Sequence, residues 1–445
     1  MRTICLYFEI HQIIHLKRYR FFDIGNDHYY YDDYANETGM NEVAERSYIP
    51  ALNTLIEMAK NSGGAFKVAL SISGVALEQL EIHAPAVIDL LHQLNETGCC
   101  EFLCEPYSHG LSSLANEDCF REEVLRQRDK MKQMFGKEPK VFRNSSLIYS
   151  DEIGGLVASM GFKGMLTEGA KHVLGWKSPN FVYTNVMNPR LKLLLKNSRL
   201  SDDLTLRFSD HSWHEWPLTA DKYARWLKDS TQDSEIVNLF MNYETFGENQ
   251  LAETGIFEFM RSLPEYIFST TDFEFLTPGE AVKKHQPVAP LHVPYPISWA
   301  DEEKDITGWL GNELQNEAFE ELFKIQPKVE ALNDPELNED YSRLQASDHF
   351  YYMRTKLFSD NDYHRYVSPY ETPYEAFINY MNVLSDFVAR VEDMEKMRNI
   401  AGNKITEEEK SSEKKKRTPR VKSAESAAKA TKKVSTKEKQ VKSKH

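Results

Sequence analysis

The sequence predicts an α/β protein built on a parallel β-sheet, either a barrel or a doubly wound sheet. Short apolar runs alternate with amphipathic stretches from the start of the chain to about residue 290. The runs KVALSIS and IVNLFM are apolar on both faces, as a parallel strand covered by helices must be. Repeated strand–helix units of this kind build parallel sheets. No Gly-x-Gly-x-x-Gly follows the first strand, which argues against a dinucleotide-binding fold.

The individual elements follow from these patterns. The predicted strands are Thr3–Ile10, Lys67–Ser73, Cys100–Cys104, Lys140–Arg143, Gly164–Thr167, Leu191–Leu195, Leu204–Phe208 and Glu235–Met241. The predicted helices between them are Val43–Lys60, Val75–Asn95, Asn116–Phe135, Glu152–Met160 and Ala220–Lys228.

The strand signal ends after His285, where the proline-rich segment QPVAPLHVPYP reads as an extended linker. Helical patterns follow at Asn312–Lys324, Glu339–Lys356 and Tyr374–Glu395. We therefore predict three parts, namely a barrel over residues 1–290, a helical region over 291–400 that packs on the barrel, and a tail over 401–445. The tail has almost no large apolar residues and is predicted to be disordered.

The charge is distributed unevenly along the chain. From Lys404 to the end there are 15 Lys/Arg and 6 Asp/Glu, a net charge of +9, whereas the whole chain carries −14 and the rest therefore −23. An acidic body repels the phosphates of nucleic acid, but a neutral glucan is indifferent to net charge. The basic tail is either a solvated extension or makes weak, salt-sensitive contacts with a polyanion.

The five cysteines, Cys5, Cys99, Cys100, Cys104 and Cys119, are odd in number and lie in the first third of the chain. This is no disulfide framework, and it suits a reducing cytosol. No companion pair at zinc spacing accompanies them, so we predict no metal site and no cofactor. Without a targeting segment or an apolar run long enough for a membrane span, we expect a cytoplasmic protein that does not enter a membrane.

Polar and aromatic residues follow four of the predicted strands at the ends where the active site of a parallel barrel lies. These exits read Glu9-Ile10-His11-Gln12, Glu101-Phe102-Leu103-Cys104-Glu105-Pro106-Tyr107-Ser108-His109, FRNSSLIY from Phe142 and NYETFGE from Asn242. Such groups are typical of a sugar-binding cleft.

These four segments resemble the motifs of glycoside hydrolase family 57, most closely its α-amylase-type members. The family's His-Gln-Pro corresponds to His11-Gln12-Ile13, and its Gly-x-x-Glu strand with a downstream Tyr and His corresponds to GCCE ending at Glu101, with Tyr107 and His109. The similarity extends over about residues 1–390. It implies an incomplete parallel barrel with seven β/α units, and an α-glucan or maltooligosaccharide as ligand.

The resemblance breaks at the two catalytic positions. The family's Phe-Arg-Asn-Thr-Glu-Leu-Ile-Tyr is FRNSSLIY here, with Ser146 in place of the nucleophile. The family's Asp-Tyr-Glu-Thr-Phe-Gly-Glu is NYETFGE here, with Asn242 in place of the acid/base. Retaining glycosidases need two carboxyl groups about 5–5.5 Å apart, so we predict an impaired enzyme. Another pair of acidic side chains facing each other across the mouth at that spacing would overturn this prediction.

Other carboxylates near these positions leave an alternative open. Asp151 and Glu152 are expected to compensate charge at a helix N-terminus. Glu244 lies two residues after Asn242 and is the best candidate for a residual acid. By resemblance it is a substrate-binding residue, as are His11, Glu101 and His109.

Exposed aromatic rings could stack on sugar faces. Trp176 is the predicted subsite residue, and Trp213, Trp216 and Trp309 are further candidates, although a single Trp is more often part of a core.

Three functions remain open from the sequence: an α-glucan-binding homologue without turnover, an active hydrolase or 4-α-glucanotransferase that uses unconventional groups, and an interaction scaffold whose tail is the functional part. The oligomeric state cannot be read from the sequence.

Overall fold

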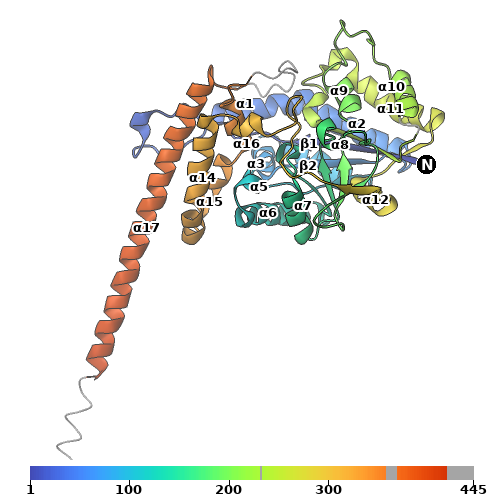
Figure 1. Ribbon diagram of the computed structural model, residues 1–445. Coiled ribbons are helices and arrows are strands. Elements are labelled where there is room, and N and C mark those ends of the chain that lie inside the picture. Colours follow the sequence, from blue (N-terminus) through green and yellow to red (C-terminus); the bar gives the residue numbers. More distant parts are fainter. Residues whose placement is uncertain (231–232, 357–367, 418–445) are drawn as a thin grey trace, which may run out of the picture. The chain divides into compact units, whose positions relative to one another are not determined.

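The computed structural model describes residues 1–230, 233–356 and 368–417, with side chains described up to Ile400 apart from residue 230. The chain divides into two compact units, Met1–Phe387 and Val388–His445. The first unit contains all the strands and helices α1 to α16 (Figure 1). Within the described residues, no helix is both long enough and apolar enough to cross a membrane.

The first unit is built around a ring of parallel strands. These are β1 (Arg2–Ile10), β2 (Val68–Ile72), β3 (Cys100–Phe102), β4 (Val141–Arg143), β5 (Gly164–Thr167), β7 (Lys192–Leu195) and β8 (Ile236–Asn242). Ladders join β3-β2-β1-β8 in one sheet and β4-β5-β7 in another. Two single parallel bridges, Cys104 to Phe142 and Lys196 to Asn238, close the seams between the sheets. The predicted seven-stranded parallel barrel is therefore confirmed.

Three short strands lie outside this ring, β6 (Tyr183–Asn185), β9 (Phe273–Phe275) and β10 (Ala289–Leu291). Strand β9 pairs with the start of β1, β6 runs antiparallel to β7, and β10 pairs with β6. Residues of the predicted proline-rich linker thus form an edge strand, a position in which Pro290 is tolerated.

Helices surround the barrel (Figure 1). Their bounds are α1 Asp33–Val43, α2 Ile49–Asn61, α3 Gly74–His83, α4 Pro85–Glu96, α5 Ser112–Ala115, α6 Glu117–Phe135, α7 Asp151–Ser159, α8 Lys171–Leu174, α9 Ser198–Thr205, α10 Ala220–Ser230, α11 Ile256–Thr270 and α12 Pro278–Lys284. A π-helix (Ala44–Tyr48) joins α1 to α2, and 3₁₀ turns occupy Phe21–Asp23, Ser145–Leu147, Tyr243–Thr245 and Ala252–Thr254.

The region after the barrel is helical, as predicted. It comprises α13 (Thr307–Leu310), α14 (Glu313–Leu332), α15 (Pro335–Leu344), α16 (Ser347–Tyr352) and α17 (Pro373–Arg417). Residues 401–417, for which composition predicts disorder, form the last turns of α17. Extending an existing helix needs no new nucleus, so a Lys- and Glu-rich segment can continue it. The rest of the predicted tail, residues 418–445, lies outside the described residues.

The predicted strand Leu204–Phe208 is wrong. Most of this segment belongs to α9 and the turn after it, because Asn197 caps the helix by accepting a hydrogen bond from the backbone N–H of Leu200. Leu200 and Leu204 then lie one turn apart and both join the core outside the barrel.

Successive residues of each strand belong alternately to two hydrophobic cores, one outside and one inside the barrel. Residues such as Ile4, Leu6 and Phe8 of β1 pack outward against the helices. Their neighbours point inward and fill the barrel together with residues of α12; this inner core includes Cys5, Tyr7, Ala69, Leu103, Val141, Leu166, Leu194, Phe240, Ala281 and Val282. The same alternation carries Glu9, Arg143 and Asn242 to the inner side at the carboxyl ends of the strands.

Gly247, which follows the β8 exit, gives a test of this packing. Its φ is 102°, and an added Cβ would lie 1.9 Å from the carbonyl oxygen of Arg46. We expect Gly247→Ala to lower the free energy of unfolding by about 3 kcal/mol, measured by urea denaturation. Gly255 is the matched control, because its φ is 83° and nothing lies within 4 Å of an added Cβ. Gly255→Ala should cost only about 1 kcal/mol, and equal losses would contradict the close approach.

Candidate functional site

The carboxyl ends of the barrel strands bring Ser146 and Asn242, the two positions at which the resemblance leads us to expect catalytic carboxylates, to one end of the barrel, which we call the mouth. Asn242 is the last residue of β8 and is paired in register with Glu9 of β1. Ser146 lies in the 3₁₀ turn after β4, is 3% exposed and has a φ of 54°. Its carbonyl oxygen accepts a hydrogen bond from the backbone N–H of Trp299 at 3.2 Å. Neither position carries a carboxylate.

A cavity of about 30 Å³ lies beside Asn242. Its lining residues are Tyr7, Glu9, Arg143, Leu147, Lys196, Thr205, Phe240, Met241, Asn242 and Trp299. This volume accommodates a water molecule but not a glucose ring. A glucan chain at this end of the barrel would therefore have to lie above Asn242, outside the cavity.

Glu9 and Glu105 form a buried ion-pair cluster with Arg143 below the mouth. Arg143 Nη2 donates a hydrogen bond to Glu9 Oε2 at 2.5 Å, and Nη1 contacts Glu9 Oε1. The same Nη1 lies 3.9 Å from Glu105 Oε2, which also accepts a hydrogen bond from Ser71 Oγ at 2.8 Å. Burial raises the pKa of both carboxyls, to about 7 for Glu9, against the opposing effect of Arg143.

This pair of carboxylates bears directly on the prediction of impaired catalysis, because Glu9 and Glu105 bring oxygens within 4.8 Å of each other. Only 4% of Glu9 and 0% of Glu105 is exposed. A glycosidase pair must flank the bond it cleaves, whereas Arg143 contacts both of these groups. In this arrangement, Glu9 and Glu105 do not provide a nucleophile and an acid on two sides of a sugar.

His11 is held by two buried partners at the end of β1. Its Nδ1 lies 2.7 Å from Ser73 Oγ, and its Nε2 lies 2.9 Å from Asp348 Oδ2. Burial alone would lower the pKa of His11, but Asp348 outweighs it and raises the pKa. The pKa of Asp348, which burial would raise, is lowered to about 2 by His11. Both ring nitrogens are thus engaged within the protein, and the predicted sugar contact of His11 stays a prediction.

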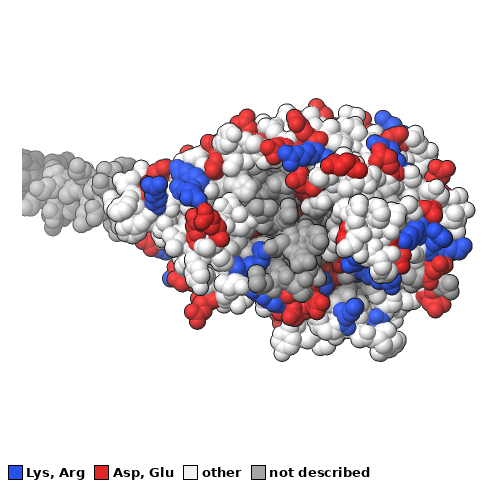
Figure 2. All heavy atoms as spheres, turned by 90° about the horizontal axis from the view of Figure 1, so that it is seen from above, with Lys and Arg blue, Asp and Glu red and all other residues white. Residues whose placement is uncertain are grey.

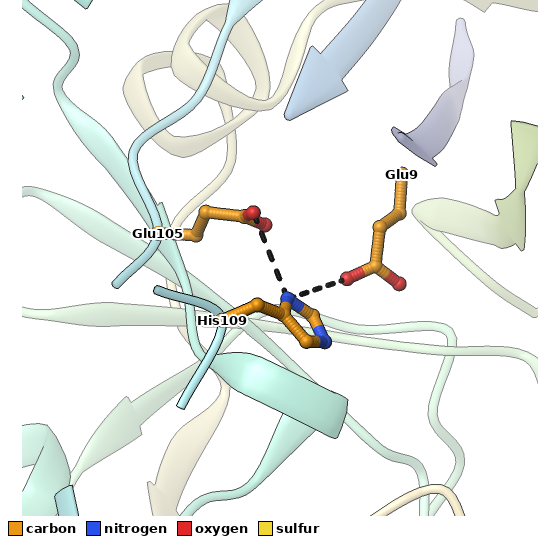
Figure 3. Close-up of side chains that lie close together, drawn as sticks. All are labelled: Glu9, Glu105 and His109. Atoms are coloured by element: carbon orange, nitrogen blue, oxygen red, sulfur yellow. Dashed lines mark ion pairs between the residues drawn. The ribbon is translucent and has the colours of Figure 1, made fainter. Parts of the chain in front are cut away.

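His109 stacks on His11, with ring centroids 3.9 Å apart. It is 1% exposed and adopts a φ of 54°. Its Nδ1 lies 3.5 Å from Glu9 Oε1 and 3.7 Å from Glu105 Oε1, and the three side chains point toward one another (Figure 3). Burial first, and then the charges of His11 and Arg143, lower the pKa of His109 well below its ordinary value. The structure therefore places this predicted residue beneath the mouth.

Glu244 lies just beyond Asn242 and is partly buried. Its Oε1 accepts hydrogen bonds from Tyr48 Oη and from Gln12 Nε2, the latter at 3.2 Å. Burial raises the pKa of Glu244 to about 7 despite these two donors. Glu244 can therefore hold a proton near neutral pH, which is the property a residual acid requires.

The raised pKa of Glu244 predicts a dependence of stability on pH. A carboxyl with a pKa near 7 in the folded state and about 4.3 in the unfolded state favours folding at low pH, and this contribution is lost as the pH rises through 7. Glu244→Gln keeps an acceptor for Tyr48 and Gln12 without the charge. We expect it to raise the free energy of unfolding by about 2 kcal/mol at pH 8 and to change it little at pH 4, measured by urea denaturation. A destabilised variant at pH 8 would contradict the raised pKa.

The structure places Glu101 away from the mouth. Glu101 lies on β3 and faces the same inner side as Leu103, which follows the strand. Its side chain accepts a hydrogen bond from the backbone N–H of Gly279 at 2.6 Å, in the first turn of α12. Helix α12 lies at the opposite, amino end of the barrel, where Val282 contacts Gly164 at the start of β5. In this structure Glu101 fixes α12, and its predicted role in substrate binding stays a prediction.

The predicted tryptophans have different environments. Trp176 is 93% exposed in the loop after α8, and among the described residues no contact joins it to the other predicted site residues. Trp309 is 2% exposed and packs against Trp299 and Tyr351, so it belongs to the core. Asp151 and Glu152 lie in the first turn of α7, as predicted.

The sequence reading missed several residues of the mouth, chiefly Glu9, Glu105, Arg143, Lys196 and Trp299. A usable signal exists for Glu9, because the alternation Cys5, Tyr7, Glu9 places it on the inner face of β1.

All five cysteines are buried and free. Acidic and basic side chains are interspersed over the face of the molecule in Figure 2.

Comparison with known proteins agrees with this architecture. The model of glycosyl hydrolase family 57 matches residues 5–294. A protein of Methanocaldococcus jannaschii named "Putative alpha-amylase" is 40% identical over 400 residues, which are 87% of this chain and 84% of that protein.

Solved structures share the fold. The 4-alpha-glucanotransferase of Thermococcus litoralis superposes with a TM-score of 0.61 at 15% identity, over 78% of this chain and 56% of that one, so this chain spans little more than half of that enzyme. The alpha-amylase AmyC of Thermotoga maritima gives a TM-score of 0.59 at 12% identity, over 90% of this chain and 94% of that one. At these identities the similarity shows the fold alone. By the family match and the 40% identity, the chain belongs to glycosyl hydrolase family 57.

Proposed function

We propose that this protein binds α-glucans at the mouth of its barrel and does not cleave them by the two-carboxylate mechanism. Membership of the family and similarity to an amylase-type protein support the ligand class. The observation that carries the proposal is the position of Ser146, just after β4, and of Asn242, at the end of β8, where the resemblance places the nucleophile and the acid/base. A serine and an asparagine can still bond sugar hydroxyls but supply neither a carboxylate nucleophile nor an acidic proton.

The other carboxylates near the mouth support the same proposal. Glu9 and Glu105 share Arg143, and Glu244 is fixed by Tyr48 and Gln12. Each of these carboxylates contacts other side chains of the protein, and no two of them face each other across a space that could hold a sugar. The free, buried cysteines suit a reducing compartment, and we place the protein in the cytoplasm.

Calorimetric titration with maltoheptaose tests the binding role. We expect saturable binding at micromolar to millimolar sugar, and no heat of binding at millimolar sugar would contradict the proposal.

Trp176 offers a sharper variant for the same titration, because its exposed ring can be removed without disturbing the core. If it stacks on a glucose ring, Trp176→Ala should weaken the binding of maltoheptaose about 3- to 10-fold. Tyr266, which is 41% exposed near the end of α11, provides the control. Helix α11 leads into β9, which pairs with the start of β1 at the amino end of the barrel. Tyr266→Ala should leave the affinity unchanged, and unchanged affinity in Trp176→Ala would exclude this subsite.

A second candidate function is an α-glucan hydrolase or 4-α-glucanotransferase that uses an unconventional acid. The proton that Glu244 holds near neutral pH favours it. Long incubation with amylose followed by product analysis decides between the two functions. Products that Glu244→Gln abolishes would support this second function, and intact amylose would exclude it.

A further inference from the structure

We propose that Glu9, Glu105 and His109 form a binding site for a divalent transition-metal ion such as Zn²⁺, buried beneath the mouth of the barrel. The three side chains come from β1 and from the segment after β3, and one ligand atom of each converges on a common point (Figure 3). Two carboxylates and one imidazole are a donor set that suits Zn²⁺ and its neighbours in the first transition series.

The spacing of the three atoms fits a small metal ion. His109 Nδ1 lies 3.5 Å from Glu9 Oε1 and 3.7 Å from Glu105 Oε1, and all three atoms lie within 4.8 Å of one another. Around a tetrahedral ion with bonds of 2.0–2.2 Å, neighbouring ligands are roughly 3.3–3.6 Å apart. Around a water molecule with hydrogen bonds of about 2.8 Å, they would be roughly 4.6 Å apart. Both distances to His109 are therefore close to the metal spacing and shorter than the water spacing.

The three atoms also lack hydrogen-bond partners. Glu9 Oε1, Glu105 Oε1 and His109 Nδ1 are buried and accept or donate no hydrogen bond, although Arg143 Nη1 contacts Glu9 Oε1 as an ion pair. Burying polar atoms in this way is costly unless something satisfies them. An ion bound at the point where they converge would satisfy all three.

The rest of each side chain is held in place. Glu105 Oε2 accepts a hydrogen bond from Ser71, Glu9 Oε2 accepts one from Arg143, and the ring of His109 stacks on His11. These contacts hold the side chains so that Glu9 Oε1, Glu105 Oε1 and His109 Nδ1 point toward one another. Supporting contacts of this kind orient the ligands of established metal sites.

The charge of the cluster favours a cation. Glu9 and Glu105 contribute −2 in their ionised form and Arg143 contributes +1, while His11 and Asp348 form an ion pair of their own, which leaves −1 among residues that are at most 7% exposed. A buried negative charge requires compensation. A cation bound by both carboxylates would supply it.

The test uses the full chain, freed of metal by a chelator and then dialysed. Titration with Zn²⁺ followed by elemental analysis should show one tightly held ion per chain. Co²⁺ should give the visible absorption of a low-symmetry site, and Zn²⁺ should raise the melting temperature. We expect Glu105→Gln and His109→Asn to weaken binding at least 100-fold. Asparagine is chosen because it tolerates the positive φ of His109.

Glu123→Gln is the matched control. Glu123 lies on α6, is 5% exposed and accepts hydrogen bonds from the backbone N–H and the hydroxyl of Ser108, so the variant removes a buried carboxylate that contacts the same segment without being part of the cluster. It should bind Zn²⁺ as the wild type does. If the ligand variants do not fold, Ser71→Ala carries the test, because losing the hydrogen bond to Glu105 should weaken binding about 10-fold.

Two results would overturn the proposal. One is less than a tenth of an equivalent of Zn²⁺ retained by the wild type. The other is equal retention by the wild type and the ligand variants, which would place the ion elsewhere on the chain. The titration contains no sugar, so its outcome is independent of glucan binding.

Discussion

Replacing Arg143 by methionine should lower the free energy of unfolding by about 3–5 kcal/mol at pH 8. The guanidinium is 3% exposed and contacts Glu9 and Glu105, which are themselves almost completely buried. Without it, two carboxylates remain close together with no cation from a side chain between them. Urea denaturation of the metal-free protein measures the loss. At pH 5 the loss should be smaller, because both carboxyls have raised pKa values and take up protons there.

Arg121→Met is the control for this experiment. Arg121 pairs with Glu117 on the surface of α6, where the two side chains are 33% and 62% exposed. Exposed ion pairs contribute about 0–1 kcal/mol, so this variant should unfold almost as the wild type does. A loss below 1 kcal/mol in Arg143→Met, or a loss that grows at pH 5, would show that Arg143 does not compensate the two carboxylates.

The double substitution Ser146→Glu with Asn242→Asp should create amylolytic activity at least about 1,000-fold above that of the wild type. It supplies a glutamate and an aspartate at the two positions where the resemblance leads us to expect the nucleophile and the acid/base. Either substitution alone should leave the protein inactive, because each carboxylate needs the other. Reducing ends released from amylose give the rate.

The geometry of Ser146 sets a limit on this rescue. Its φ of 54° costs a glutamate about 1 kcal/mol, which the fold can bear. Ser146→Gln with Asn242→Asp is the control, since it supplies similar volume without the nucleophile. A double variant that folds and binds maltoheptaose yet releases no reducing ends would show that the mouth has lost more than its two carboxylates.

Local patterns predicted most of the barrel. Seven of the eight predicted strands exist, because runs such as KVALSIS and IVNLFM can be buried on both faces only in a covered parallel sheet. The prediction of a strand at Leu204–Phe208 was wrong because an alternating pattern only five residues long also fits the end of a helix. The segment is helical because Asn197 caps α9 and because this helix packs against the core outside the barrel.

The candidate site was predicted less completely, for a physical reason. His11 and His109 were found because their segments carry motifs. The contact of Glu9 with Arg143 joins residues 134 positions apart, and that of His11 with Asp348 joins residues 337 apart. Such pairs are set by the closure of the barrel and the docking of α16, which no local pattern encodes. The motif also does not show at which end of the barrel the side chain of Glu101 makes contact.

Chromatography of maltoheptaose after prolonged incubation with the wild-type chain tests the central claim most directly. Binding at the mouth without the family's two carboxylates predicts that the sugar is recovered at its original length. Shorter or longer oligosaccharides that accumulate in proportion to time and protein concentration, and that are absent with Glu244→Gln, would contradict it.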